Sequence, residues 1–128
     1  MLFRSAHNRY PMTRNFVGEL VSQLLPDPEL RVIAPACLDV TLRRRGSTVF
    51  VHLINRSSGI PNLSNNGAVD EIPHIGPVTV RMKSPVQPQQ VSWRFEDGKP
   101  EHQWNNGVLT VRIPSVKIHG VLEVVRPA

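Results

Sequence analysis

The 128 residues, 40% of them hydrophobic and 20% charged, suit one globular domain that buries roughly two-thirds of its unfolded surface, and they exclude a chain that is disordered throughout. The single cysteine excludes an internal disulfide framework and any motif built from several cysteines. A nucleic-acid-binding protein would concentrate the formal net charge of +5 in one patch, whereas here it gathers in two short clusters: Arg4, Arg9 and Arg14, and the triplet Arg43 to Arg45.

Residues 11–25 have the periodicity of an amphipathic helix. Large apolar residues recur at steps of four: Met12, Phe16, Leu20 and Leu24. Pro11 suits a first helical turn, and the Pro-Asp-Pro sequence at 26–28 ends the helix, because proline lacks an amide hydrogen and restricts the residue before it. We therefore predict one helix of about 14 residues within an N-terminal helical segment, 1–28, that precedes a sandwich domain, 29–128.

After Pro35 the period of the apolar residues changes to two, which is typical of strands with one buried and one exposed face. Apolar and polar residues alternate in four runs: Leu38 to Leu42, Val78 to Met82, Val91 to Phe95 and Leu109 to Ile113. The run 49–54 is mostly apolar on both sides and predicts a central strand covered on two sides, and 120–125 is a weaker case. With a short strand at 101–104, about seven strands favour a mostly β, antiparallel, immunoglobulin-like sandwich.

Turn residues separate these runs. Residues that tolerate positive φ occur at 44–47, 97–98 and 105–107 and predict hairpin connections. Residues 55–77 are rich in Gly, Pro, Asn and Ser and have no sustained period. We predict a long loop there, and loops of that length in compact domains are usually functional, covered by a partner or mobile.

The chemically active residue types lack the spacing of known sites. The five histidines fall in five separate segments, none paired at the spacing of a helical zinc motif: His7, His52, His74, His102 and His119. No glycine-rich phosphate loop and no recognisable signature around Cys37 or Ser57 is present. Carboxylates that could act on a glycoside all lie in predicted loops or turns: Asp70, Glu71, Glu96, Asp97 and Glu101. We therefore predict no metal site, no cofactor and no catalytic residue.

Five residues are assigned binding or structural roles. Trp104 lies beside a loop, and we favour core or interface packing for it over the alternative of a sugar-stacking platform. That alternative would make Trp104, His102 and Tyr10 the contacts of a carbohydrate-binding module. His52 is predicted to lie among apolar neighbours with a hydrogen-bonded ring nitrogen, and Asn55 to cap the strand end by bonding backbone groups.

Three stretches carry a resemblance to a known class of proteins: TVFVHLINRSSG at 48–59, EIPHIGPVTVRMK at 71–83, and the final QQVSWRFEDGKPEHQWNNGVLTVRIPSVKIHGVLEVV at 89–125. They resemble the C-terminal β-sandwich of multidomain glycoside hydrolases of the beta-galactosidase type. Residues 7–47 are similar to the linking region of the same proteins, where a helix precedes the sandwich.

The resemblance implies a domain without catalysis, because the catalytic carboxylates of such enzymes belong to a preceding (β/α)-barrel. No residue of that active site can be carried over to this chain, and Met1 suggests a fragment, a truncated reading frame or a separate accessory subunit. The expected partner is a glycosidase catalytic domain, or a second copy, reached through apolar surface. The alternatives are a carbohydrate-binding module and, less favoured, a small basic nucleic-acid-binding domain that uses Arg43 to Arg45.

No run approaches the roughly 20 apolar residues of a membrane span, and the first residues have no apolar core of a signal peptide. We expect a soluble chain with no membrane partner. The compartment is open, with the cytoplasm favoured.

Overall fold

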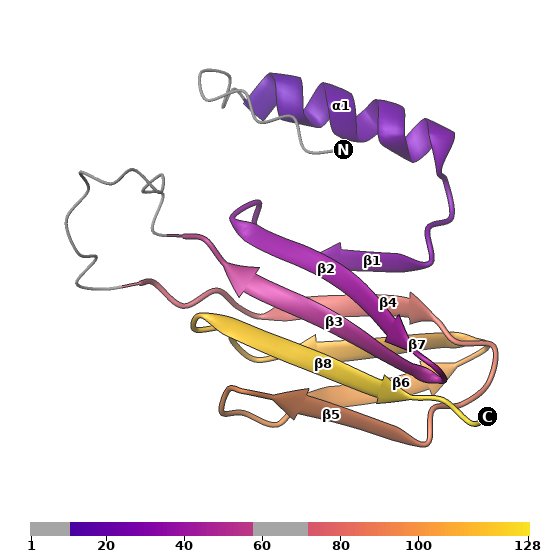
Figure 1. Ribbon diagram of the computed structural model, residues 1–128. Helices are drawn as coiled ribbons and strands as arrows, with labels where there is room; N and C mark the ends of the chain where they lie inside the picture. Colours follow the sequence, from indigo (N-terminus) through magenta and orange to yellow (C-terminus); the bar gives the residue numbers. More distant parts are fainter. Residues whose placement is uncertain (1–10, 58–71) are drawn as a thin grey trace.

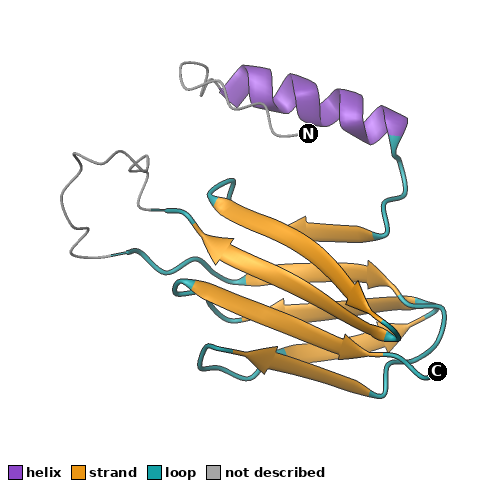
Figure 2. Cartoon of the chain, in the orientation of Figure 1, coloured by secondary structure: helices purple, strands orange, loops and turns teal. Residues whose placement is uncertain are grey.

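The computed structural model describes residues 11–57 and 72–128 and consists of one helix followed by eight strands (Figure 1). The elements are α1 (Pro11–Leu24), β1 (Leu30–Ile33), β2 (Leu38–Arg45), β3 (Thr48–Asn55), β4 (Val78–Lys83), β5 (Gln90–Arg94), β6 (Glu101–Asn105), β7 (Val108–Ile113) and β8 (His119–Val125). The strands form two four-stranded sheets, in the orders β1-β4-β7-β6 and β2-β3-β8-β5, and all paired neighbours are antiparallel. The two sheets lie face to face (Figure 2). The predicted mostly β, antiparallel sandwich with one N-terminal helix is confirmed.

The core fills the space between the two sheets. The buried residues come from the four central strands, β3 and β8 in one sheet and β4 and β7 in the other; burial alternates in β3, β4 and β7, whereas in β8 residues 120–122 are all buried. The fully buried members include Val51, Leu53, Val78, Val80, Val111, Ile113, Leu122 and Val124. Burial of each such side chain is worth roughly 1.5–3 kcal/mol relative to its exposure, so this layer supplies most of the driving force for folding.

One strand was not predicted. β1 has only four residues, and it adds to the edge of its sheet by pairing Leu30 with Met82 and Val32 with Val80 of β4. Four residues are too few for alternation to be distinguished from chance, because each face then has only two positions.

The connection between β5 and β6 differs from the predicted hairpin. β5 pairs with β8 and β6 pairs with β7, so residues 95–100 cross from one sheet to the other. Phe95 was expected to point inward with Val91 and Trp93, but β5 ends at Arg94 and Phe95 has a φ of 71° and is 83% exposed. The other two predicted hairpins are present, with positive φ at Gly46 and at Asn106 and Gly107.

The second face of β3 is open rather than covered. Phe50 and His52 are half-buried on the outer side of their sheet, and Ile54 is exposed. The strand is central in its sheet, as predicted, because it has partners on both edges, but a single layer packs against it. The apolar residues on the outer face are therefore available for contact with another surface.

The helix α1 confirms the predicted start and length, and its stripe is exposed. Met12, Phe16 and Leu24 are 82%, 63% and 85% exposed. In Figure 1 the helix lies on the side of β1 and β2 and leads into β1 through a short connection. Among the described residues, no helix is long and apolar enough to cross a membrane.

Candidate functional site

Asn55 joins three separate segments at the end of β3. Its side-chain amide Nδ2 donates to the carbonyl oxygens of Pro73 at 2.8 Å, Lys117 at 2.8 Å and Val116 at 3.3 Å. Its Oδ1 accepts from the backbone N–H of Ser57 at 2.9 Å. The side chain is buried and all its hydrogen-bonding groups are used, so this geometry is that of a structural cap of the kind expected from the sequence.

His52 lies on the outer face of its sheet and faces a second histidine. Its Nδ1 is 3.1 Å from Nε2 of His119 on β8, and the two rings stack with centroids 5.4 Å apart. The ring nitrogen is hydrogen-bonded as expected, but the partner is another imidazole. Burial, His119 and Arg43 all lower the pKa of His52 below its ordinary value. The lowered pKa favours the neutral imidazole of His52, whose Nδ1 can then share one hydrogen bond with Nε2 of His119.

Trp104 and His102 lie on β6, at the edge of the other sheet. The indole ring of Trp104 packs against the core, and its Nε1 donates to the carbonyl oxygen of Ser84 at 2.9 Å. This placement favours the packing alternative over a sugar platform, because the ring and its polar atom are already in use. His102 is exposed, and Tyr10 lies outside the described residues.

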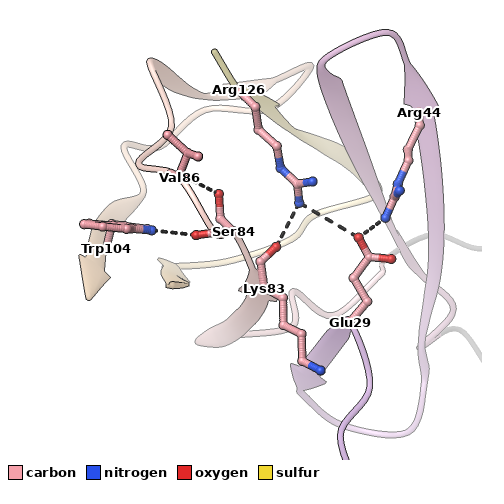
Figure 3. A network of polar contacts seen from close by, with 7 residues as sticks. All are labelled: Glu29, Arg44, Lys83, Ser84, Val86, Trp104 and Arg126. Atoms are coloured by element: carbon pink, nitrogen blue, oxygen red, sulfur yellow. Dashed lines mark hydrogen bonds and ion pairs between the residues drawn. The ribbon is translucent and has the colours of Figure 1, made fainter. Parts of the chain in front are cut away.

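Trp104 belongs to a polar network that ties the C-terminus to the sandwich (Figure 3). Arg126, which follows β8, donates from Nη2 to the carbonyl oxygen of Lys83 at 2.9 Å and lies 3.9 Å from the carboxylate of Glu29. Glu29 also pairs with Arg44. The network connects the residue after β8 with β2 and with the end of β4, and it therefore joins the two sheets.

The network also bears on the basic triplet of β2. Because side chains alternate along a strand, Arg44 points to the side opposite Arg43 and Arg45, and it is occupied by Glu29. The three charges therefore do not face one ligand together, which weakens the nucleic-acid alternative.

An end surface forms where the segments after β5 and before β8 meet, and it was missed from the sequence. Phe95 and Ile118 are 83% and 63% exposed, and with His119 they border an open hollow of about 550 Å³. The carboxylate of Glu96 accepts from the backbone N–H groups of Lys117 at 2.8 Å and Ile118 at 2.6 Å. The backbone of Phe95 has a positive φ, which is uncommon and strained for a bulky residue.

The carboxylates of this end surface are engaged in structural contacts. Glu96 holds the neighbouring backbone, and Asp97 lies 3.5 Å from Nζ of Lys117. Within residues 11–57 and 72–128, no three His, Cys, Asp or Glu side chains gather as a metal site requires. Asp70 and Glu71, which the sequence offered as further carboxylates, lie outside the described residues. The end surface therefore presents exposed apolar side chains beside the pair of His52 and His119.

The comparisons with known proteins point to a class of fold. No protein-family model matches the chain, and no curated protein does. The two-layer antiparallel sandwich does occur among solved structures.

One such structure is the alpha-L-fucosidase isoenzyme 2 from Paenibacillus thiaminolyticus, which this chain resembles with a TM-score of 0.70 and 17% sequence identity. The similarity covers 90% of this chain and 18% of that one, so this chain spans a small part of that protein's length. At this identity the likeness establishes a shared fold, and the beta-galactosidase-type family stays a prediction.

Proposed function

We propose that the chain is a noncatalytic β-sandwich domain of a glycoside hydrolase that packs on a catalytic domain or on a second copy. The observation that carries the proposal is the fold shared with the fucosidase, which takes in nearly all of this chain but only 18% of that enzyme. A domain of that share is a module within a larger enzyme. The agreement with the independent sequence resemblance to beta-galactosidase-type enzymes supports the same class.

The exposed apolar residues support packing on a partner. The stripe of α1, formed by Met12, Phe16, Leu20 and Leu24, is largely in solvent, and a 14-residue helix is marginal in water unless its apolar face is buried. Gly18 weakens it further, by roughly 1 kcal/mol relative to alanine. Burial of this stripe against a partner would stabilise the helix and offset the cost of Gly18.

The end surface supports the same role. Phe95 and Ile118 are two large exposed apolar residues on neighbouring segments, and Ile54 on the adjoining strand end is also exposed. Exposed apolar residues that gather on one surface mark interaction sites. Of the two carboxylates beside them, Glu96 accepts from two backbone N–H groups and Asp97 lies 3.5 Å from Nζ of Lys117, which fits an interaction surface better than an acid and base pair.

A co-expression experiment tests the proposal. The chain would be produced with the glycoside hydrolase barrel encoded by the same or an adjacent reading frame, and the complex measured by size exclusion with light scattering. We expect a complex that is lost in the double variant Phe16→Asp and Leu20→Asp. The matched control is Asn15→Asp, which adds a charge to the polar side of α1 and should leave the complex intact. If neither a complex with the barrel nor a self-complex forms, the proposal is wrong.

A further inference from the structure

A row of polar side chains crosses the outer face of the β1-β4-β7-β6 sheet. Arg31 of β1 pairs in register with Arg81 of β4, Arg81 with Thr110 of β7, and Thr110 with Gln103 of β6. Residues in register on neighbouring strands point to the same side of a sheet. The four side chains therefore line up across the full width of the sheet, about 14 Å at a spacing of about 4.8 Å between strands.

Part of this row lines a hollow. This hollow of about 360 Å³ is open to solvent and is bordered by Arg81, Gln103, Asn105, Asn106, Val108 and Thr110. That volume lies in the range of sites that hold small ligands. Its lining combines a guanidinium with three amides and a hydroxyl, and is therefore mainly polar.

The charge of the row is uncompensated. Like charges directly opposite each other on a sheet are destabilising, and Arg31 and Arg81 stand opposite each other. Several other cations on the described surface do have carboxylate partners, as in Arg94 with Glu123 and Arg56 with Asp39, whereas Arg43, like the two arginines of the row, has none. Within residues 11–57 and 72–128, neither Arg31 nor Arg81 forms an ion pair. An anion bound between them would relieve the repulsion.

We propose that this face, which we name the arginine row (Arg31, Arg81, Thr110 and Gln103), binds an acidic oligosaccharide. Planar guanidinium groups suit the carboxylates of uronic acids and the oxygens of sulfate esters, which they contact with paired hydrogen bonds. The amides of Gln103, Asn105 and Asn106 and the hydroxyl of Thr110 can donate to and accept from sugar hydroxyls. The ligand is therefore a polyhydroxylated chain that carries negative charge.

The same face disfavours a nucleic acid as the ligand. Single-stranded nucleic acids bind through basic grooves combined with aromatic side chains on which bases stack. The outward positions of the four strands carry no aromatic residue, because Trp104 and the other inward residues of β6 point to the core side. The choice of a glycan over another anionic polymer rests on the proposed function in a glycoside hydrolase.

Calorimetric titration of the full chain tests the inference. The probes are an oligogalacturonide, a sulfated chondroitin oligosaccharide, a neutral cello-oligosaccharide and a single-stranded DNA oligonucleotide. We expect binding of at least one acidic oligosaccharide, weaker binding at higher salt, and no binding of the neutral one. The two acidic probes separate carboxylate from sulfate as the charged group.

The variant Arg81→Gln should weaken that binding about tenfold or more, since a charge-assisted hydrogen bond is lost. The matched control Arg43→Gln removes one exposed charge from the outer face of the other sheet and should leave the affinity unchanged. Thermal unfolding verifies the fold, and Arg81→Gln should not lower the midpoint because it relieves repulsion. The inference is overturned if neither acidic probe binds, if Arg81→Gln binds as well as the wild type, or if DNA binds more tightly than either oligosaccharide.

The experiments distinguish a failure of this inference from a failure of the proposed function. The arginine row lies on strands, whereas docking is tested by substitutions in α1. If the chain forms the complex with the barrel but binds no acidic oligosaccharide, only the proposed ligand of the arginine row is wrong. If the chain binds an acidic oligosaccharide but forms no complex, the docking role is wrong and the binding site stands.

Discussion

Gly120 of β8 lies against the indole ring of Trp93 on the neighbouring strand β5. A Cβ atom at residue 120 would come within 2.0 Å of Cζ2 of that ring, far inside any carbon contact. The absence of a side chain at this position is therefore what allows Trp93 to pack against the core.

Replacement of Gly120 by alanine should displace the Trp93 ring. We expect Gly120→Ala to lower the free energy of unfolding by about 1–3 kcal/mol, the usual cost of overpacking, as measured by urea denaturation. Gly18→Ala is the control, because no atom outside the helix lies within 4 Å of its Cβ position and alanine favours a helix. Equal stability of Gly120→Ala and the wild type would show that the ring does not occupy this position.

Asn55→Asp should destabilise the end of β3. An ionised carboxylate cannot donate, so the carbonyl oxygens of Pro73, Val116 and Lys117 would face negative charge. The expected loss is about 1–3 kcal/mol in the free energy of unfolding. Asn105→Asp, at an exposed position on β6, is the control. A loss in the control as large as that in Asn55→Asp would argue against a capping role.

The histidine pair should make stability depend on pH. The pKa of His52 is lowered below 6.5 by burial, His119 and Arg43, so around that pH the unfolded chain binds more protons than the folded one. This contribution to stability is therefore present above pH 6.5 and is lost as the pH falls from there through the folded pKa. Glu123 of β8, in register with Phe50, forms an ion pair with Arg94.

Thermal unfolding of wild type and His52→Gln between about pH 8 and about pH 5 measures the effect. The wild type should lose more stability over this interval than the variant. His102→Gln, which replaces an exposed histidine, is the control and should follow the wild type. Identical pH profiles for wild type and His52→Gln would contradict the lowered pKa.

The sandwich should fold without α1. A chain of residues 27–128 keeps Asp27, which bonds Lys83, and Glu29, which joins the network of Arg44 and Arg126. We expect its unfolding midpoint to lie within a few degrees of that of the full chain, because the apolar residues of α1 are largely in solvent. A fall of more than about 10 °C would mean that α1 belongs to the core and that the predicted boundary after residue 28 is misplaced.

The elements that could be predicted are those whose pattern is local. The helix was identified because its apolar residues recur at steps of four between two proline signals, and β7 because three inward residues alternate with polar ones. A local pattern identifies a strand but not its partner. The 97–98 turn signal is the same for a hairpin and for a crossing between sheets, which is why the connection after β5 was misjudged.

The site residues also divide into those that a local pattern indicates and those that only the fold brings together. Asn55 at a strand end indicated a cap, but its partners at residues 73, 116 and 117 are brought to it only by the fold. The arginine row was not visible either, since Arg31, Arg81 and Gln103 are far apart in sequence and meet through strand register alone. Arg81 was visible only as an outward residue of an alternating strand.

The proposal that this domain has no catalytic activity is tested most directly by the hydrolysis of chromogenic aryl glycosides, including α-L-fucosides and β-galactosides, by the purified full chain. We predict a rate equal to that of the buffer alone for every substrate, because Glu96 already accepts two backbone hydrogen bonds and Asp97 lies beside Nζ of Lys117. Turnover above the buffer rate that is abolished by Glu96→Gln or Asp97→Asn would contradict a noncatalytic domain.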